Sequence, residues 1–181
     1  MIMELLGERG ALERQLAIER LGASVLRQPA EAVGEVEDGV RELVTSMFAT
    51  MYAATGQGLA APQVGISRQI AVVDVPSQPG AVYVLVNPRL VMASEQRTRA
   101  PEGCLSVPGV SAVVERHAHV AIEAMDLEGH PQRLEASGEL ARCFQHEIDH
   151  LNGILYLDHV SPLARRVLVD RYRKQRRGGR A

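Results

Sequence analysis

The sequence predicts an α+β fold, and three observations support that prediction. Apolar residues recur at helical spacing within 36–54, a segment at 138–151 has helix start and stop signals, and Pro162 can open a third helix. Short runs rich in valine and isoleucine occupy the middle of the chain, which is typical of β-strands. The strands do not alternate with helices, so a parallel βαβ arrangement is not expected.

The first half of the chain predicts one helix and then a β-rich region. Five apolar side chains share one helical face in 36–54, namely Val40, Leu43, Val44, Met47 and Met51. Gly56 and Gly58 end this pattern. Strands are expected at four apolar runs, which are 70–75, 82–86, 113–114 and 120–125. Pro76 ends the first run, and Asn87-Pro88 ends the second.

The second half returns to helix after one more strand. Glu128-Gly129 predicts a turn that leads into a strand at 132–134. A helix is expected over 138–151, because Asn152-Gly153 gives it a stop signal. A brief strand is expected at 154–157.

Length and composition favour a single domain over residues 1–181. The chain is 46% hydrophobic and 23% charged, which is ordinary for a soluble globular protein of this size. Residues 1–15 mix charge with leucine and are expected to form a helical or loosely ordered extension. Residues 162–181 are expected to form a C-terminal helix, to about Arg177, and a basic tail.

Charge and hydropathy argue against several classes of protein. The formal net charge of -2 argues against a chain that binds polyanions as a whole, and no DNA partner is expected. No apolar run approaches the roughly 20 residues that span a bilayer, and the N-terminus does not resemble a signal peptide. We therefore expect a cytoplasmic protein without a membrane partner, whose Cys104 and Cys143 stay reduced.

The sequence His146-Glu147-Ile148-Asp149-His150 is an HExxH motif inside the helix expected at 138–151. Residues four apart on a helix share a face, so His146 and His150 can bind one metal ion. A divalent metal lowers the pKa of a bound water, and the neighbouring carboxylate of Glu147 can exchange protons with that water. The motif therefore predicts a hydrolytic metal site.

A third protein ligand is expected because catalytic zinc-type sites usually have three. His159 lies nine residues beyond His150, and Tyr156 stands where the long metzincin pattern has its third histidine. Upstream, Cys104 follows Gly103 in a predicted loop and could bind a metal as thiolate, although burial as a small apolar residue is the alternative. We interpret Cys143 as core or as pocket lining.

The segment Gly56-Gln57-Gly58-Leu59-Ala60-Ala61-Pro62-Gln63 has small side chains that leave its backbone accessible. Such a backbone can run beside an extended peptide like an added strand. Gln63 offers an amide donor that could stabilise an oxyanion. A simple turn after the helix is the alternative, and a phosphate loop is excluded because no GK[ST] follows.

Together the three motifs GxGLAAxQ, EGCLS and QHExDH stand in an order that resembles the peptide deformylase family. The resemblance spans roughly residues 20 to 160. It implies an α+β fold with small antiparallel or mixed sheets around a central HExxH helix, and helices at the N- and C-terminal sides. It also implies a metal-dependent hydrolase that removes the formyl group from the N-terminal methionine of new proteins and releases formate.

The family pattern assigns roles to individual residues. Cys104, His146 and His150 would be the metal ligands, and Glu147 would be the general base and then the general acid. The backbone N–H of Leu105 and the side chain of Gln63 would form the oxyanion hole, and the backbone of Gly58 would hold the peptide, as the motif positions imply. The implied cofactor is one divalent ion, Fe(II) in the cell, with Zn(II), Ni(II) or Co(II) as substitutes.

Some positions depart from the family pattern without touching a ligand. Ser111 stands where many members have arginine, and Gln57 stands where valine or isoleucine is common, so substrate preference beyond formyl-methionine is open. Arg116 lies at the family's usual arginine position. We hypothesise that it pairs with a carboxylate near the site, such as Asp149, whereas a solvated arginine at a strand end is the alternative.

The C-terminal segment 171–181 contains six lysines or arginines among its eleven residues. A basic run at a chain end is typical of a nucleic-acid contact, so we hypothesise that it docks on ribosomal RNA near nascent N-formylmethionyl peptides. A solvated tail is the alternative. Two rival functions stay open as well: an HExxH peptidase that cuts internal bonds, and a non-catalytic relative that only binds ribosomes or regulates.

Overall fold

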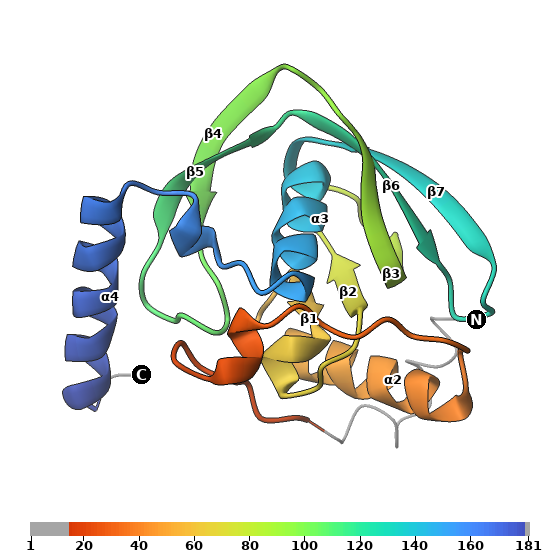
Figure 1. Ribbon diagram of the computed structural model, residues 1–181, viewed down its shortest axis with the longest axis horizontal. Helices are drawn as coiled ribbons and strands as arrows, with labels where there is room; N and C mark the ends of the chain where they lie inside the picture. The colour runs from red at the N-terminus through yellow and green to blue at the C-terminus, as the bar shows by residue number, and fades with distance from the viewer. Residues whose placement is uncertain (1–14, 180–181) are drawn as a thin grey trace.

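The computed structural model describes residues 15–179, and the extension expected at 1–15 lies almost wholly outside them (Figure 1). The helices are α2 (Asp38–Ala53), α3 (Gly138–Leu151) and α4 (Pro162–Arg177), and the short 3-10 turns are η2 (Ser24–Arg27), η3 (Ala61–Val64) and η4 (Tyr156–Asp158). The strands are β1 (Gly58–Ala60), β2 (Ile70–Asp74), β3 (Val82–Ala93), β4 (Arg97–Glu102), β5 (Ala112–His117), β6 (His119–Met125) and β7 (Pro131–Ser137). This element order is the α+β arrangement that the sequence predicts.

Two antiparallel sheets surround α3. Five strands form the larger sheet in the order β1-β2-β3-β6-β7, and β4 pairs with β5 in a separate two-stranded sheet. Figure 1 shows α3 inside the frame made by the two sheets, with α4 standing at the side of the body. Because β1 is an edge strand, one side of its backbone carries no strand pairing within the sheet.

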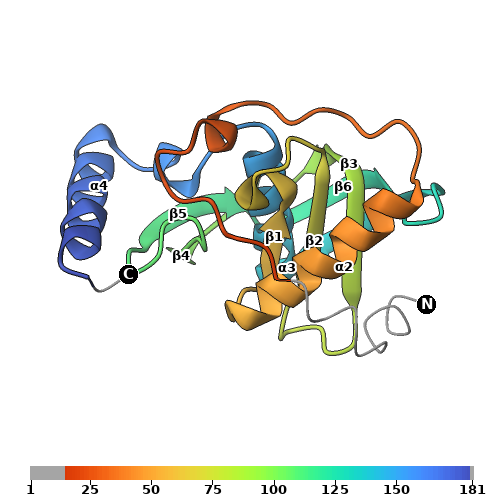
Figure 2. The ribbon, with the colours of Figure 1, turned by 90° about the horizontal axis from the view of Figure 1, so that it is seen from below.

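The centre of the larger sheet packs between α3 and α2, which explains why β2 is a continuous apolar run. One face packs against α3 through a core that includes Ala71, Val73 and Phe144. The other face packs against α2 through a core that includes Val72 and Phe48 (Figure 2). Successive side chains of a strand point to opposite faces, so β2 must be apolar at every position to fill both cores.

The strand expected at 82–86 runs further than predicted. Asn87-Pro88 does not end β3, because the chain makes a bulge there and the register against β6 shifts between Val86 and Arg89. Asn87 has φ 52, and its side-chain amide bonds both the N–H and the C=O of Val33, each at 2.8 Å. A bulge tolerates a proline, because a residue in a bulge does not have to donate a backbone hydrogen bond to the neighbouring strand.

The brief strand expected at 154–157 is wrong. The chain forms the turn η4, in which Leu155 N–H donates to Asp158 Oδ2 and Asp158 N–H donates to the Leu155 carbonyl, both at 2.8 Å. Leu155, Tyr156 and Leu157 are buried in a third core beside β5 and Tyr172, which explains the apolar run without a strand. In the part of the chain that the structure describes, no helix is long and apolar enough to cross a membrane.

Candidate active site

Helix α3 presents the HExxH residues toward a cavity, while its opposite face packs on the larger sheet. Leu140, Ala141 and Phe144 belong to the core on that opposite face. His146 and Glu147 line the cavity, which has a volume of about 890 Å³. The helical period thus places the apolar residues in the core and the ionisable residues at the cavity, as the motif predicts.

Cys104 lies in the loop that follows β4 and lines the same cavity as His146 and Glu147. Its sulfur lies 3.2 Å from Nε2 of His150, and the donor atoms of Cys104, His146 and His150 all lie within 4.8 Å of one another. A tetrahedral site with ordinary metal–sulfur and metal–nitrogen bonds separates neighbouring donors by about 3.5 Å. One thiolate and two imidazoles at this spacing fit a single divalent ion, so the three donors that the sequence names do converge.

The electrostatics of the three donors suit a metal ligand set. Burial raises the pKa of the Cys104 thiol, but the charges of and hydrogen bonds to His150 and His146 lower it well below its usual value. A lowered pKa favours the thiolate, which is the form that binds metals. His146 is held through Nδ1 by Glu102 Oε2 at 3.1 Å, which leaves its Nε2 for the ion.

Glu147 is a buried carboxylate whose Oε2 has no hydrogen-bond partner within the described residues. Only 3% of the residue is exposed. Burial raises the pKa of Glu147 to about 7, even though the charges of His146 and His150 oppose that shift. A carboxylate with this pKa can take up and release a proton near neutral pH, which is what an acid–base group requires.

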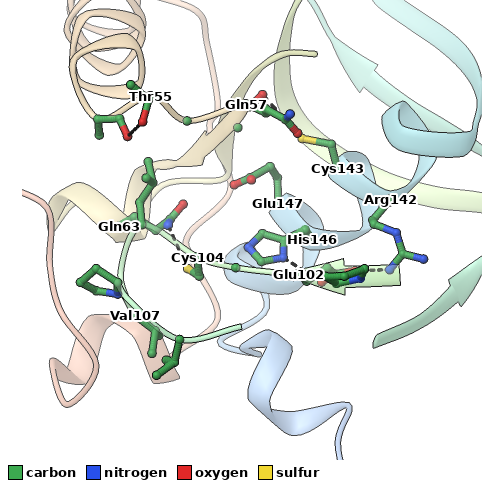
Figure 3. A pocket seen from close by; sticks show the side chains of 18 of the residues that line it. Thr55, Gln57, Gln63, Glu102, Cys104, Val107, Arg142, Cys143, His146 and Glu147 are labelled. Carbon is green, nitrogen blue, oxygen red and sulfur yellow. Dashed lines mark hydrogen bonds and ion pairs between the residues drawn. The ribbon is translucent and has the colours of Figure 1, made fainter. Parts of the chain in front are cut away.

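Gln63 is fixed beside the metal ligands by hydrogen bonds at both ends of its amide. Its Oε1 accepts from the Ala60 N–H at 2.8 Å, so its Nε2 must point away from β1. Nε2 lies 3.5 Å from the Cys104 sulfur and 3.3 Å from Ser106 Oγ, and Figure 3 shows it directed toward Cys104. Among the described residues, no group accepts a hydrogen bond from the Leu105 N–H.

The strand β1 approaches α3 so closely that only glycine fits at position 58. A Cβ on Gly58 would lie 2.3 Å from Glu147 Oε1 and 2.9 Å from the Cys143 sulfur. Since β1 pairs with β2 on one side only, its free edge borders the cavity beside Glu147. Cys143 lines the cavity and also belongs to the core, which agrees with both parts of its interpretation.

A buried network of charged side chains holds His146 through its Nδ1, on the side of the ring away from the proposed metal. Arg116 donates through Nε and Nη2 to the two oxygens of Glu102 at 3.0 Å each, and through Nη1 to Asp149 Oδ2 at 2.5 Å. The hypothesised pairing of Arg116 with Asp149 is therefore confirmed, and only 4% of the Arg116 side chain is exposed. Asp149 also bonds His159 at 2.6 Å.

Glu102 and Arg142 are members of this network that sequence reasoning missed. Arg142 Nη1 lies 2.6 Å from Glu102 Oε1, and this pair is visible at the right of Figure 3. Burial raises the pKa of Glu102, but hydrogen bonds from His146 and Arg116 outweigh that effect and hold it well below its usual value. The sequence does give one indication of the role of Glu102, because it lies two residues before the proposed ligand Cys104.

The two departures from the family pattern occupy different places. Gln57 lines the cavity and donates through Nε2 to Glu139 Oε1 at 2.9 Å, so it forms a polar bridge between the segment before β1 and the start of α3. Ser111 is exposed before β5 and does not contribute to the cavity wall.

Comparison with known proteins identifies the family. The family model described as "Polypeptide deformylase" matches residues 15–166. A peptide deformylase of Brucella suis is 45% identical over 152 residues, which cover 83% of this chain and 87% of the relative. The chain belongs to the polypeptide deformylase family. A second peptide deformylase, from Thermosynechococcus vestitus, is 48% identical over 147 residues, with 80% of this chain and 78% of the relative covered.

Solved peptide deformylases have the same fold. The crystal structure of the Synechococcus elongatus enzyme in complex with actinonin matches with a TM-score of 0.82 and 45% identity, and it covers 88% of this chain and 87% of that one. The enzyme of Ehrlichia chaffeensis matches with a TM-score of 0.87 at 36% identity, over 91% and 98% of the two chains. The chain is therefore an enzyme of the deformylase type, a hydrolase of N-formylmethionyl ends, as the sequence predicts.

Proposed function

We propose that this deformylase hydrolyses the formyl group of nascent N-formylmethionyl peptides in the cytoplasm, with one divalent ion held by Cys104, His146 and His150. One observation carries the proposal: three donor atoms from two separate segments converge within 4.8 Å beside an unpartnered buried carboxylate. We further propose that the ion is Fe(II) in the cell and that Zn(II), Ni(II) or Co(II) can replace it. Two imidazoles and one thiolate suit these borderline ions better than magnesium or calcium.

A bound divalent ion supplies a Lewis acid that lowers the pKa of water and polarises a carbonyl oxygen. Glu147 takes the proton of the attacking water, and its pKa of about 7 suits that role. After the carbon–nitrogen bond breaks, the same carboxyl group gives its proton to the departing amine of methionine. Formate and the free N-terminus are the products.

Gln63 and Leu105 are placed to stabilise the oxyanion that forms on the formyl oxygen. Gln63 is held rigidly through its Oε1, so its Nε2 protons face the ligand cluster without reorganisation. The Leu105 N–H follows the ligand Cys104 directly and has no acceptor among the described residues. Two such donors on one oxygen are worth several kcal/mol in related hydrolytic sites, at roughly 3 kcal/mol for each donor.

The free edge of β1 would hold the substrate peptide in an extended form. The N–H and C=O groups of Gly58 lie at that edge, and the absence of a side chain keeps the peptide close to Glu147. Backbone pairing carries no sequence preference, which suits an enzyme that acts on many nascent chains. The side chain of the methionine would then fill the cavity lined by Gln57, Arg142 and Cys143.

The test is formate release from formyl-Met-Ala-Ser by protein purified without oxygen and loaded in turn with Fe(II), Ni(II) and Zn(II). Glu147→Ala is the control. Release that depends on the metal and on Glu147 is the expected result, and it would rank the ions. Metal binding without formate would favour the non-catalytic alternative, whereas cleavage of casein would favour the peptidase. A protein that binds no metal would overturn the site.

We also propose that the basic C-terminal region contacts ribosomal RNA. Helix α4 and the segment around η2 form a hollow of about 590 Å³ lined by five arginines, which are Arg27, Arg165, Arg173, Arg176 and Arg177. Arg27 and Arg165 pair with Asp158 at 2.5 Å and 3.0 Å. Within residues 15–179, no carboxylate lies within 4.0 Å of the other three, which leaves their charge for an anionic partner.

Co-sedimentation with ribosomes tests this contact. Deletion of residues 171–181 should release the protein, and binding by the full chain should weaken steeply as salt is raised, because phosphate contacts release counterions. A double exchange of Arg89 and Arg133 for glutamate, two exposed arginines of the larger sheet, is the charge control, and it lowers the net charge by 4 against 6 for the deletion. Unchanged sedimentation of the deletion variant would reject the contact.

A further inference from the structure

Arg142 joins three segments of the chain with one side chain. It stands on α3, one turn before His146, and donates through Nη1 to Glu102 Oε1 at 2.6 Å and to the Val114 carbonyl at 3.0 Å. Nη2 donates to the Thr98 carbonyl at 3.0 Å and lies 3.3 Å from Thr98 Oγ1. The acceptors belong to β4 and β5, so the guanidinium fixes the two-stranded sheet to the helix (Figure 3).

The two-stranded sheet leads into Cys104, and side chains of α3 hold it in place. Besides Arg142, Gln145 bonds the N–H and the C=O of His117, and His146 bonds Glu102. A pair of strands is marginally stable alone and needs packing against another element. Four of the six residues of β4 are exposed, and Glu102 at its end is the buried one. Cys104 follows two residues later, so the distance from its sulfur to the imidazoles depends on where this sheet lies against α3.

Arg142 also acts on the histidine side of the site. Glu102 bonds Nδ1 of His146, and Arg142 is the second guanidinium on that carboxylate after Arg116. The two arginines differ in what else they hold. Arg116 binds Asp149 near the end of α3, whereas Arg142 binds strand carbonyls near the start of the helix. Removal of Arg142 leaves Glu102 paired with Arg116 and His146, but it removes the hydrogen bonds from α3 to the Thr98 and Val114 carbonyls.

We propose that Arg142 is a positioning residue that sets the separation between the Cys104 thiolate and the two imidazoles, and thereby the affinity and geometry of the metal site. The inference rests on the metal site proposed above. The guanidinium suits the task because its planar fork reaches four acceptors at once, while an ammonium group at the end of a lysine reaches fewer of them from a single point.

The experiment measures Co(II) binding to the metal-free protein and to Arg142→Gln. The charge-transfer absorption of a cobalt–thiolate bond reports Cys104, and the intensity of the visible d–d bands reports four-coordinate geometry. Competition with a chelator gives the dissociation constant. Arg142→Gln should raise that constant about 10- to 100-fold, as loss of residues that orient metal ligands typically does. It should also weaken or shift the thiolate band. Arg142→Lys should show a smaller loss, of about threefold or more.

The control is Arg89→Gln, which removes an exposed arginine of β3 whose ion-pair partner is Glu123 of β6 and not a residue of the site. It should bind cobalt as the parent does. Circular dichroism establishes that each variant is folded at the temperature of the titration. If Arg142→Gln does not fold, the cobalt dissociation constant and spectrum of Arg142→Lys test the proposal instead.

The outcomes separate this inference from the function on which it rests. A parent protein without a cobalt–thiolate band overturns the metal site and the inference with it. A folded Arg142 variant with the parent's dissociation constant and spectrum overturns the inference alone. A variant with lower thermal stability but an unchanged cobalt site also overturns it, because Arg142 would then serve folding and not the ligands.

Discussion

The two sides of His146 hold two buried carboxylates with opposite properties. On one side, Glu102 is 6% exposed and is held by Arg116, Arg142 and His146, which keep its pKa well below the usual value. On the other side, Glu147 is 3% exposed and has an oxygen without a partner, and its pKa rises to about 7. Two carboxylates that both have little exposure to solvent thus become a permanent anion that orients a ligand and an acid–base group that exchanges a proton.

The largest expected effect comes from Glu147→Gln, which removes the proton acceptor without changing the size of the side chain. Formate release should fall about 10²- to 10⁴-fold, the usual contribution of a positioned general base. Metal content should stay at the parent's level, because the three ligands are untouched. Retention of more than a tenth of the activity would assign the proton transfer to another group.

Substitution of Glu102 should affect the free energy of unfolding more than the rate of formate release. Glu102→Ala leaves the buried guanidinium of Arg116 with Asp149 alone and should lower the free energy of unfolding by about 3 kcal/mol. Chemical denaturation of the metal-free protein measures this. Exchange of the exposed Glu123, which pairs with Arg89, is the matched control and should change stability by less than about 1 kcal/mol.

Gly58→Ala tests how closely β1 must approach Glu147. The added Cβ would fall 2.3 Å from Glu147 Oε1, so the carboxylate has to move away from the reacting water. We expect kcat/KM to fall about 100-fold, since small misplacements of catalytic groups have effects of that order. Gly34→Ala, at an exposed position where an added Cβ would meet nothing within 4 Å, should leave kcat/KM unchanged. Equal activity of the two variants would contradict the close approach.

The pH dependence of kcat/KM should show an acid limb that belongs to Glu147. The group must be ionised to take a proton, so the rate falls tenfold per pH unit below its pKa. That pKa is about 7 without an ion, and a bound divalent cation lowers it, so the midpoint should lie between about pH 5 and 7. A midpoint above 7 would contradict the assignment.

A further effect is expected on the stability of the metal-free protein. The pKa of Glu147 is higher in the folded state than its ordinary value of 4.5, so the folded protein loses stability as pH rises from about 4.5 to 7. Glu147→Gln removes that loss and should therefore stabilise the metal-free protein by about 3 kcal/mol at pH 8. At about pH 4 the difference should be nearly absent. Thermal unfolding at the two pH values measures it.

Local patterns in the sequence were sufficient for the helices and for most of the central strands. The helix expected at 138–151 is α3 with the same bounds, and the run at 70–75 is β2. These segments are determined locally, because an apolar face and a glycine stop signal each act within a few residues. The strand β4 was missed for the same reason: its residues are polar and exposed, and it exists only through pairing with β5.

The sequence by itself determined which residues carry the chemistry: the HExxH spacing names three of them, and the Gly-rich and Cys104 motifs name the rest through the family resemblance. Only the tertiary structure decided that the Cys104 sulfur lies 3.2 Å from His150 Nε2 and that Glu102 and Arg142 support His146. It also decided that Glu147 Oε2 has no hydrogen-bond partner among residues 15–179. The physical reason is distance along the chain. Spacing fixes neighbours on one helix, but contacts between residues more than 40 positions apart depend on how the two sheets pack around α3.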